Sequence, residues 1–147
     1  KLQAELDRSL APCTVNSFVS LATQGYYTGT SCHRLATSGI FILQCGDPTG
    51  TGRGTPGYAF NDEVSPDTTY PAGAIAMANS GKNTNGGQFF FIYADTPLPP
   101  NYTVFGHLDA ASTEAVAERA YQGHDASNSD GTGRPLVPTE FKAVTLG

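Results

Sequence analysis

Charged residues are scarce in this chain, and lysine and arginine never form a run. Asp, Glu, Lys and Arg make up 14% of the 147 residues, and the formal net charge is −5. Non-specific nucleic-acid binding requires a basic field, so this composition disfavours a nucleic-acid partner. No stretch has the length and hydropathy of a membrane span, and none resembles a signal peptide. We therefore expect no membrane contact by this domain.

The compartment stays open at this stage. The chain starts at Lys1, directly in an alternating strand pattern. This start is compatible with a cytoplasmic protein and with an extracytoplasmic, tethered domain whose anchor lies outside these residues.

Cysteine is also rare, with three residues at Cys13, Cys32 and Cys45. An odd number leaves at least one thiol unpaired within the chain, and one disulfide is possible without the sequence fixing its partners. The adjacent Cys32 and His33 admit a thiol or metal enzyme as a remote hypothesis. Neighbouring residues of a strand point to opposite faces, however, and no ligand spacing typical of a metal site is present. We predict neither a metal nor a cofactor.

Chain breakers and aromatic residues, in contrast, are abundant. The chain holds 17 Gly and 10 Pro, which indicates many turns, and its 8 Phe and 7 Tyr favour strands. A length of 147 residues suits one domain with one core. We therefore expect a single β-rich domain over residues 1–147.

The apolar pattern predicts short strands and two helices. Helices are expected over 12–24 and 112–122, because Gly25 and Gly123 supply stops after apolar or amphipathic stretches. Strands are expected at 2–6, 31–35, 41–45, 74–78, 88–93, 103–108 and 141–146. Residues 36–40 and 79–87 are expected as connections, and 123–138 as a flexible loop. This pattern fits a closed antiparallel barrel with helices over its ends.

The strongest local feature is the polar, glycine-rich run 79–87, which leads directly into Gln88 and three consecutive phenylalanines. One interpretation is a hairpin loop before a core strand. The other is a groove whose polar rim holds a peptide backbone while phenylalanines line an apolar pocket.

The second feature is Arg34 in the run Cys32–Leu35, followed by the apolar stretch 41–44 that ends at Gln44. If these two strands pair, Arg34 and Gln44 share a face. An arginine among apolar side chains is costly unless it forms a structural ion pair or performs a task.

A third pattern is weaker. Residues 52–57 formally match the G-x-G-x-x-G pattern of dinucleotide sites. That fingerprint requires a strand before it and a helix after it, and Pro56 with the residues that follow does not open a helix. We interpret this segment as a turn-rich rim loop.

Together these stretches resemble the cyclophilin family of peptidyl-prolyl cis/trans isomerases, and the resemblance extends from the first strand to Leu146. One family signature reads Phe-His-Arg, a short turn, then Phe-Met-x-Gln-x-Gly-Asp; here it corresponds to 32–34 and 41–47. The second signature, Met-Ala-Asn-x-Gly-x-Asn-Thr-Asn-Gly-x-Gln-Phe-Phe, is matched from Met77 to Phe90. Residues 104–106 match the family's next strand, and 99–103 are most similar to actinobacterial cyclophilins.

The resemblance implies a fold and an activity. The expected fold is a mainly β, closed antiparallel eight-stranded barrel capped by two helices, with the family's first strand absent before Lys1. The expected activity is X–Pro cis/trans isomerisation in proline-containing peptides and unfolded proteins, assisting their folding, by a monomer. The alternative is a proline-peptide binding or chaperone module with the same groove and negligible turnover.

The resemblance also implies roles for individual residues. Arg34 matches the catalytic arginine. The floor and walls of the proline pocket correspond to Phe41, Ile42 and Phe90, and Leu98 is expected to complete it.

Further positions match contacts to the peptide backbone. Gln44 and Gln88 correspond to polar side chains beside that backbone. The segment that pairs with the residues before proline corresponds to Ala78, Asn79 and Ser80. Gly50 matches a glycine at the groove rim.

Several positions depart from the family pattern. Cys32 replaces the usual Phe, and Cys45 replaces a usual Gly or Ala. Leu98 stands near the place where many eukaryotic members carry Trp, and Tyr102 where they carry His. Because Leu98 has no indole N–H donor, we expect weak cyclosporin binding and unimpaired isomerase activity.

Overall fold

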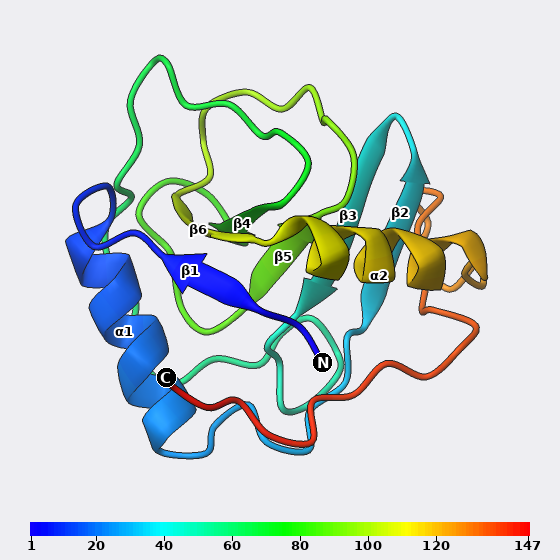
Figure 1. Ribbon diagram of the computed structural model, residues 1–147, viewed down its shortest axis with the longest axis horizontal. Coiled ribbons are helices and arrows are strands. Elements are labelled where there is room, and N and C mark those ends of the chain that lie inside the picture. Colours follow the sequence, from blue (N-terminus) through cyan, green and yellow to red (C-terminus); the bar gives the residue numbers. More distant parts are fainter.

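The computed structural model describes residues 1–147, with six strands and two helices (Figure 1). The helices are α1 (Pro12–Thr23) and α2 (Ala110–Tyr121). The strands are β1 (Ala4–Leu6), β2 (Arg34–Ser38), β3 (Ile40–Cys45), β4 (Ala74–Met77), β5 (Phe89–Ile92) and β6 (Val104–Leu108).

The strands form one antiparallel sheet in the order β1-β6-β4-β5-β3-β2. No ladder joins β1 to β2. The expectation of a mainly β fold with two helices is confirmed. The expectation of eight strands is wrong, because the sheet has six.

The C-terminal segment pairs with the rest of the chain without forming a strand. Residues 141–146, expected as a strand, pair only at Phe141, whose carbonyl and N–H bond to Gly29 and Thr30. Single bridges join Ser31 to Glu140 and Leu35 to Gly133. Pro135 and Pro138 lie between Gly133 and Glu140, where these two bridges form, and proline cannot donate to a ladder.

The hairpin of β2 and β3 also differs from the expectation. The connection predicted at 36–40 is strand except for Gly39, which turns the chain with a φ of +79°. Thr37 and Ser38 pair with Phe41 and Ile40, respectively. A single residue with positive φ was therefore sufficient for the turn.

Both faces of the sheet are covered. The larger apolar cluster joins one face to the helices, and includes Leu43, Phe89, Val15 of α1 and Val116 of α2. A smaller cluster, which contains Ile42 and Phe90, covers the other face. This double coverage explains why all four residues of β5 are buried without polar alternation.

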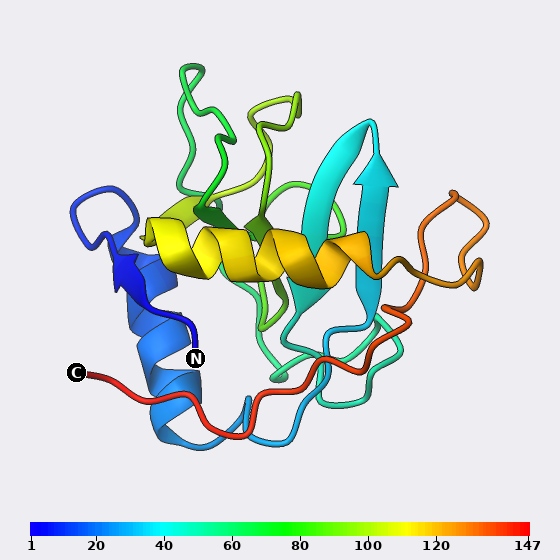
Figure 2. The same ribbon diagram turned by 45° about the vertical axis from the view of Figure 1, so that its right-hand side comes forward.

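The views in Figures 1 and 2 show how the helices and loops lie around the sheet. In both views α2 crosses in front of the sheet, and α1 stands at the side of β1. The segment before β4 and the segment between β5 and β6 project from the same end (Figure 2). They are joined by Tyr70, whose hydroxyl bonds to the backbone of Tyr102.

Candidate active site

Arg34, Gln44 and Phe90 occupy paired positions in three neighbouring strands. Arg34 of β2 lies opposite Gln44 of β3, which lies opposite Phe90 of β5, and Ala76 of β4 continues the row. Directly paired residues project from the same face of a sheet. The row therefore brings a guanidinium, an amide and an aromatic ring together from distant parts of the sequence.

Three hydrogen bonds hold the Arg34 guanidinium. Nη1 donates to Oε1 of Gln44 at 3.1 Å, Nε donates to Oγ1 of Thr132 at 3.2 Å, and Nη2 donates to Oδ2 of Asp130 at 3.1 Å. One N–H on each terminal nitrogen is left without a protein partner. Because the side chain is 27% exposed, these remaining donors are open to a ligand while the group stays fixed.

The amide of Gln44 is oriented by a chain of hydrogen bonds that starts in the loop after β3. Nε2 of Gln88 donates to the carbonyls of Gly52 at 2.9 Å and Gly54 at 3.1 Å. Oε1 of Gln88 therefore faces Gln44 and accepts from its Nε2 at 2.9 Å. Gln44 in turn presents its oxygen to Arg34 and retains one N–H for a ligand.

The loop that supplies these carbonyls is anchored by the fully buried Asp47. Its carboxylate accepts hydrogen bonds from the N–H groups of Thr49, Gly52 and Gly54 and from the Thr49 hydroxyl. Burial raises the pKa of Asp47, but these hydrogen bonds outweigh burial and lower the pKa below its ordinary value. A charged Asp47 thus holds the loop against Gln88 at neutral pH.

A buried apolar cluster adjoins Arg34 on the same face of the sheet. Ile42 and Phe90 are buried there, and Leu98 and Tyr102 pack against them from the segment before β6. The Tyr102 ring lies 5.7 Å from the Phe90 ring at 82°, an edge-to-face contact. The cluster is completed by Ala36, Tyr70, Ala74, Ala76 and Ile92.

A hollow of about 430 Å³ lies next to Gln44 and Gln88, which line it together with Ala78, Asn79 and Ser80. The N–H of Ala78 donates to the carbonyl of Gln88 at 3.1 Å, which continues the β4–β5 pairing into the wall. The rest of the lining is Gly52, Arg53, Gly54, Thr55, Tyr58, Ala59, Thr84, Gly86 and Gly87. A second hollow, lined by α1, Tyr58 and Phe60, contains none of the predicted site residues.

Comparison with known proteins identifies the family. The family described as cyclophilin type peptidyl-prolyl cis-trans isomerase matches residues 1–141. The chain belongs to this family.

Individual relatives and a solved cyclophilin structure support this family assignment. The probable peptidyl-prolyl cis-trans isomerase B of Mycobacterium tuberculosis is 48% identical over 149 residues, which cover 92% of this chain and 48% of that protein. A peptidyl-prolyl cis-trans isomerase of Schizosaccharomyces pombe is 40% identical over 99% of this chain and 93% of its own. A Cryptosporidium parvum cyclophilin crystallised in the presence of the dipeptide Ala-Pro superposes with a TM-score of 0.83 and 34% identity, over 99% of this chain and 92% of that chain.

The chain spans about half the length of the mycobacterial relatives, 48% in M. tuberculosis and 52% in M. leprae. The expected similarity to actinobacterial cyclophilins is confirmed by these matches, at 46% to 48% identity. No helix in the chain is both long enough and apolar enough to cross a membrane.

Two residues expected at the cyclophilin site lie elsewhere. Phe41 precedes Ile42 in β3, so strand alternation turns its side chain to the opposite face of the sheet. There the centre of its ring lies 6.0 Å from the centre of the Tyr93 ring. The structure therefore does not bring Phe41 to the apolar cluster that contains Ile42 and Phe90. Gly50 lies outside the lining of the hollow, and its carbonyl accepts a hydrogen bond from Arg134.

Asp130 and Thr132 are site residues that the sequence reasoning missed. They come from the segment expected as a flexible loop, yet both bond to Arg34. The hydrogen bond from the Thr132 hydroxyl, with smaller contributions that include Arg34, lowers the pKa of Asp130 to about 2. The sequence offered one signal, the turn-forming run Asp130-Gly131-Thr132. No local pattern shows that this turn bonds to Arg34, which lies 96 residues before Asp130.

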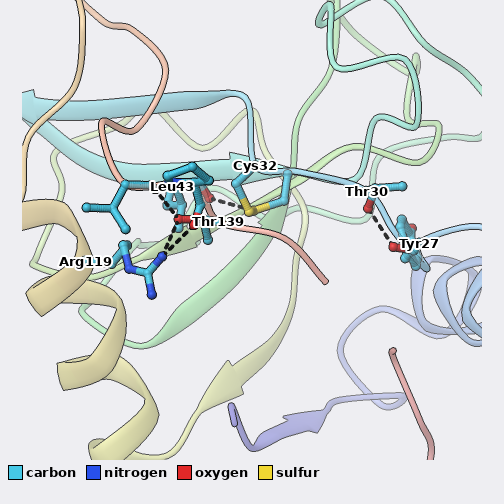
Figure 3. The surroundings of a disulfide bond; sticks show 9 residues. Tyr27, Thr30, Cys32, Leu43, Arg119 and Thr139 are labelled. Carbon is cyan, nitrogen blue, oxygen red and sulfur yellow. Dashed lines mark hydrogen bonds between the residues drawn. A yellow bond between two sulfur atoms is a disulfide. The ribbon is translucent and has the colours of Figure 1, made fainter. Parts of the chain in front are cut away.

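The thiol hypothesis for Cys32 is wrong in this structure. Cys32 forms a disulfide with Cys45, and both are buried, so neither is a free nucleophile (Figure 3). Cys13 is the free, exposed cysteine. No group of three His, Cys, Asp or Glu side chains comes together as a metal site.

Proposed function

We propose that residues 1–147 act as one cyclophilin domain that catalyses cis/trans rotation of X–Pro bonds, with Arg34 as the catalytic residue. The observation that carries the proposal is the position of the Arg34 guanidinium. It is fixed by three hydrogen bonds, retains unpartnered N–H groups, and borders the apolar cluster that contains Ile42 and Phe90.

Rotation of an X–Pro bond is slow because amide resonance opposes it, with a barrier of roughly 18–20 kcal/mol. In the twisted state the proline nitrogen regains a lone pair and becomes a better acceptor. A guanidinium N–H aimed at this nitrogen stabilises the twisted state more than the planar one, which is differential binding of the transition state. Arginine suits the task because it stays charged and its donors form a rigid fork.

The neighbouring residues hold the substrate in this account. The proline ring packs against the partly buried Leu98 and Tyr102, at the edge of the cluster that contains Ile42 and Phe90. This contact excludes water and strengthens the field of Arg34. The free N–H of Gln44 binds a carbonyl beside the reacting bond. Residues 78–80 bind the residues before proline along the hollow.

The substrates proposed are proline-containing peptides and unfolded proteins, bound weakly because both isomers enter and leave. The Ala-Pro dipeptide present with the Cryptosporidium parvum cyclophilin supports this class. Cyclosporin is proposed to bind weakly, because Leu98 has no indole N–H. We propose that the domain works as a monomer.

The experiment is isomerisation of a short Ala-Pro peptide, followed by NMR exchange spectroscopy so that binding and interconversion are read in one sample. We expect resonance shifts on binding and cross-peaks between cis and trans forms that grow with protein concentration. The alternative, a recognition module without turnover, shares the apolar cluster and the hollow. Peptide shifts without exchange cross-peaks would favour that alternative and refute the isomerase.

A further inference from the structure

The segment 124–135 is fastened to β2 beside Arg34. The N–H of Leu35 donates to the carbonyl of Gly133 at 2.7 Å, and the N–H of Gly133 donates back to Leu35 at 3.2 Å. This pair of backbone bonds brings the turn Asp130-Gly131-Thr132 to the residue next to Leu35, which is Arg34. The turn therefore reaches the guanidinium from the side that Gln44 does not occupy.

The single hydroxyl proton of Thr132 has a fixed direction. Oγ1 donates to Oδ1 of Asp130 at 2.6 Å, so toward other groups it acts as an acceptor. It accepts from Nε of Arg34 at 3.2 Å and from Nδ2 of Asn128 at 3.1 Å. Because Thr132 is only 7% exposed, water competes little for these bonds.

Asp130 provides the second acceptor for the Arg34 guanidinium. Oδ1 accepts the N–H of Thr132 at 3.0 Å together with its hydroxyl, which leaves Oδ2 for Nη2 of Arg34. The carboxylate and the hydroxyl thus present two acceptors, to Nη2 and to Nε. The Asp130 side chain is 53% exposed, so this ion pair contributes little to overall stability.

The turn is itself held in place. Oδ1 of Asp125 accepts the N–H groups of Ser127 and Arg134, and the N–H of Asn128 donates to the carbonyl of Thr132 at 3.1 Å. Gly133 is packed so closely that a Cβ would lie 1.9 Å from the carbonyl oxygen of Asp125. These contacts therefore fix the backbone that carries the two acceptors, the Asp130 carboxylate and the Thr132 hydroxyl.

We propose that Asp130 and Thr132 are positioning residues for Arg34: they fix the guanidinium from the side opposite Gln44, so that its free N–H groups point at the X–Pro nitrogen. The inference rests on the proposed isomerase function. The turn then contributes to catalysis by orienting Arg34, without contacting the substrate itself.

The test compares Thr132→Val, which keeps the shape and removes the acceptor, with Thr132→Ser, which keeps the hydroxyl. We expect Thr132→Val and Asp130→Ala each to lower kcat about fivefold or more while KM stays within about twofold. Thr132→Ser is expected to retain kcat within about twofold of the parent. If Thr132→Val fails to fold, Asp130→Ala, on a half-exposed side chain, decides the test.

Asp7 and Ser9 provide matched controls. They repeat the Asp-x-hydroxyl pattern, with the Ser9 hydroxyl 2.7 Å from Oδ1 of Asp7, and have no contact with Arg34. Asp7→Asn and Ser9→Ala are expected to leave kcat unchanged. In the Arg34→Ala background, Asp130→Ala is expected to change kcat/KM less than about twofold, because the group it positions is gone.

An NMR measurement separates this inference from the proposed function. The Nε–H signal of Arg34 is expected to exchange slowly with water in the parent and at least about tenfold faster in Thr132→Val. Unchanged exchange, or an unchanged kcat in both Thr132→Val and Asp130→Ala, would overturn the positioning role. A parent with slow Nε–H exchange but no isomerase activity would overturn the proposed function, and the catalytic role of the turn with it.

Discussion

His33, the residue before Arg34, is a buried base. Its side chain has no hydrogen-bond partner at Nδ1, and the residue is 7% exposed. Burial lowers its pKa below 6.5, and the positive charges of Arg134 and Arg34 act in the same direction, while Asp47 opposes them. The folded protein therefore keeps this imidazole neutral where the unfolded chain would already be protonated.

This difference predicts an acid-sensitive stability. Because the unfolded state binds more protons, the free energy of unfolding falls as the pH drops below about 6.5 and continues to fall until the folded-state pKa is reached. Each unit by which the pKa is lowered contributes about 1.4 kcal/mol. Urea unfolding of the parent between about pH 7.5 and pH 5.5 is expected to show this loss, and His33→Phe is expected to flatten it. A parent with the same slope as His33→Phe would contradict the account, and His107→Gln, at an exposed histidine, serves as the control.

Individual site residues were predictable where a motif and a strand period agreed. Arg34 and Gln44 were expected to share a face if their strands paired, and the register confirms that they do. Phe41 was assigned by resemblance alone, and the strand period places its ring on the opposite face, beside Tyr93. The contact of Asp130 with Arg34 could not be predicted, because no local pattern in the sequence links these two residues.

At the scale of elements, α1 depends on a residue far from it in sequence. Its N-cap residue, Ala11, has no side-chain acceptor. Glu63 takes this place: Oε1 accepts the N–H and hydroxyl of Thr14 at 2.7 Å each, and Oε2 accepts the N–H of Cys13 at 3.2 Å. A carboxylate here satisfies orphan donors and complements the helix dipole.

Replacement of Glu63 is therefore expected to destabilise the protein. Glu63→Ala should lower the free energy of unfolding by about 1–2 kcal/mol, and Glu63→Gln by less, since an amide oxygen can still accept. Chemical denaturation monitored by circular dichroism measures both. The control Asp67→Ala, at an exposed carboxylate, should change stability by less than about 0.5 kcal/mol. Equal losses for Glu63→Ala and Asp67→Ala would argue against the cap.

The sequence predicted elements better than their partners. Pro12, Gly25 and the apolar spacing located α1, but the cap from Glu63 had no sequence signal. A closing strand was expected at 141–146, whereas the backbone of this segment pairs only at Phe141. Pairing partners decide whether an extended segment becomes a strand, and they are not encoded in that segment.

At the scale of the whole molecule, the C-terminal segment is bonded both to α2 and to the end of the β2–β3 hairpin that carries the Cys32–Cys45 disulfide. The disulfide closes the open end of the β2–β3 hairpin, and the N–H of Cys32 donates to Thr139 of the C-terminal segment at 2.8 Å (Figure 3). Arg119 of α2 donates to the carbonyl of Pro138 in the same segment. The sequence left the pairing open, because three cysteines allow three pairs.

Removal of the disulfide is expected to cost stability. The bridged residues are 13 apart, so the Cys32→Ala/Cys45→Ala variant should lose about 3 kcal/mol of unfolding free energy. Cys13→Ala should lose far less, because Cys13 is exposed and unbridged. Thiol titration of the unreduced protein in denaturant should detect one thiol, and three after reduction; three thiols before reduction would refute the disulfide.

If this chain rotates X–Pro bonds through Arg34, kcat/KM for an Ala-Pro peptide should depend on that side chain, and Arg34→Ala tests this dependence most directly. Arg8→Ala, at an exposed arginine away from the site, is the matched control. We predict a measurable rate for the parent and for Arg8→Ala, and a fall of at least about tenfold in Arg34→Ala, equivalent to ~1.4 kcal/mol of lost transition-state stabilisation. A folded Arg34→Ala variant with the parent's kcat/KM would contradict the account.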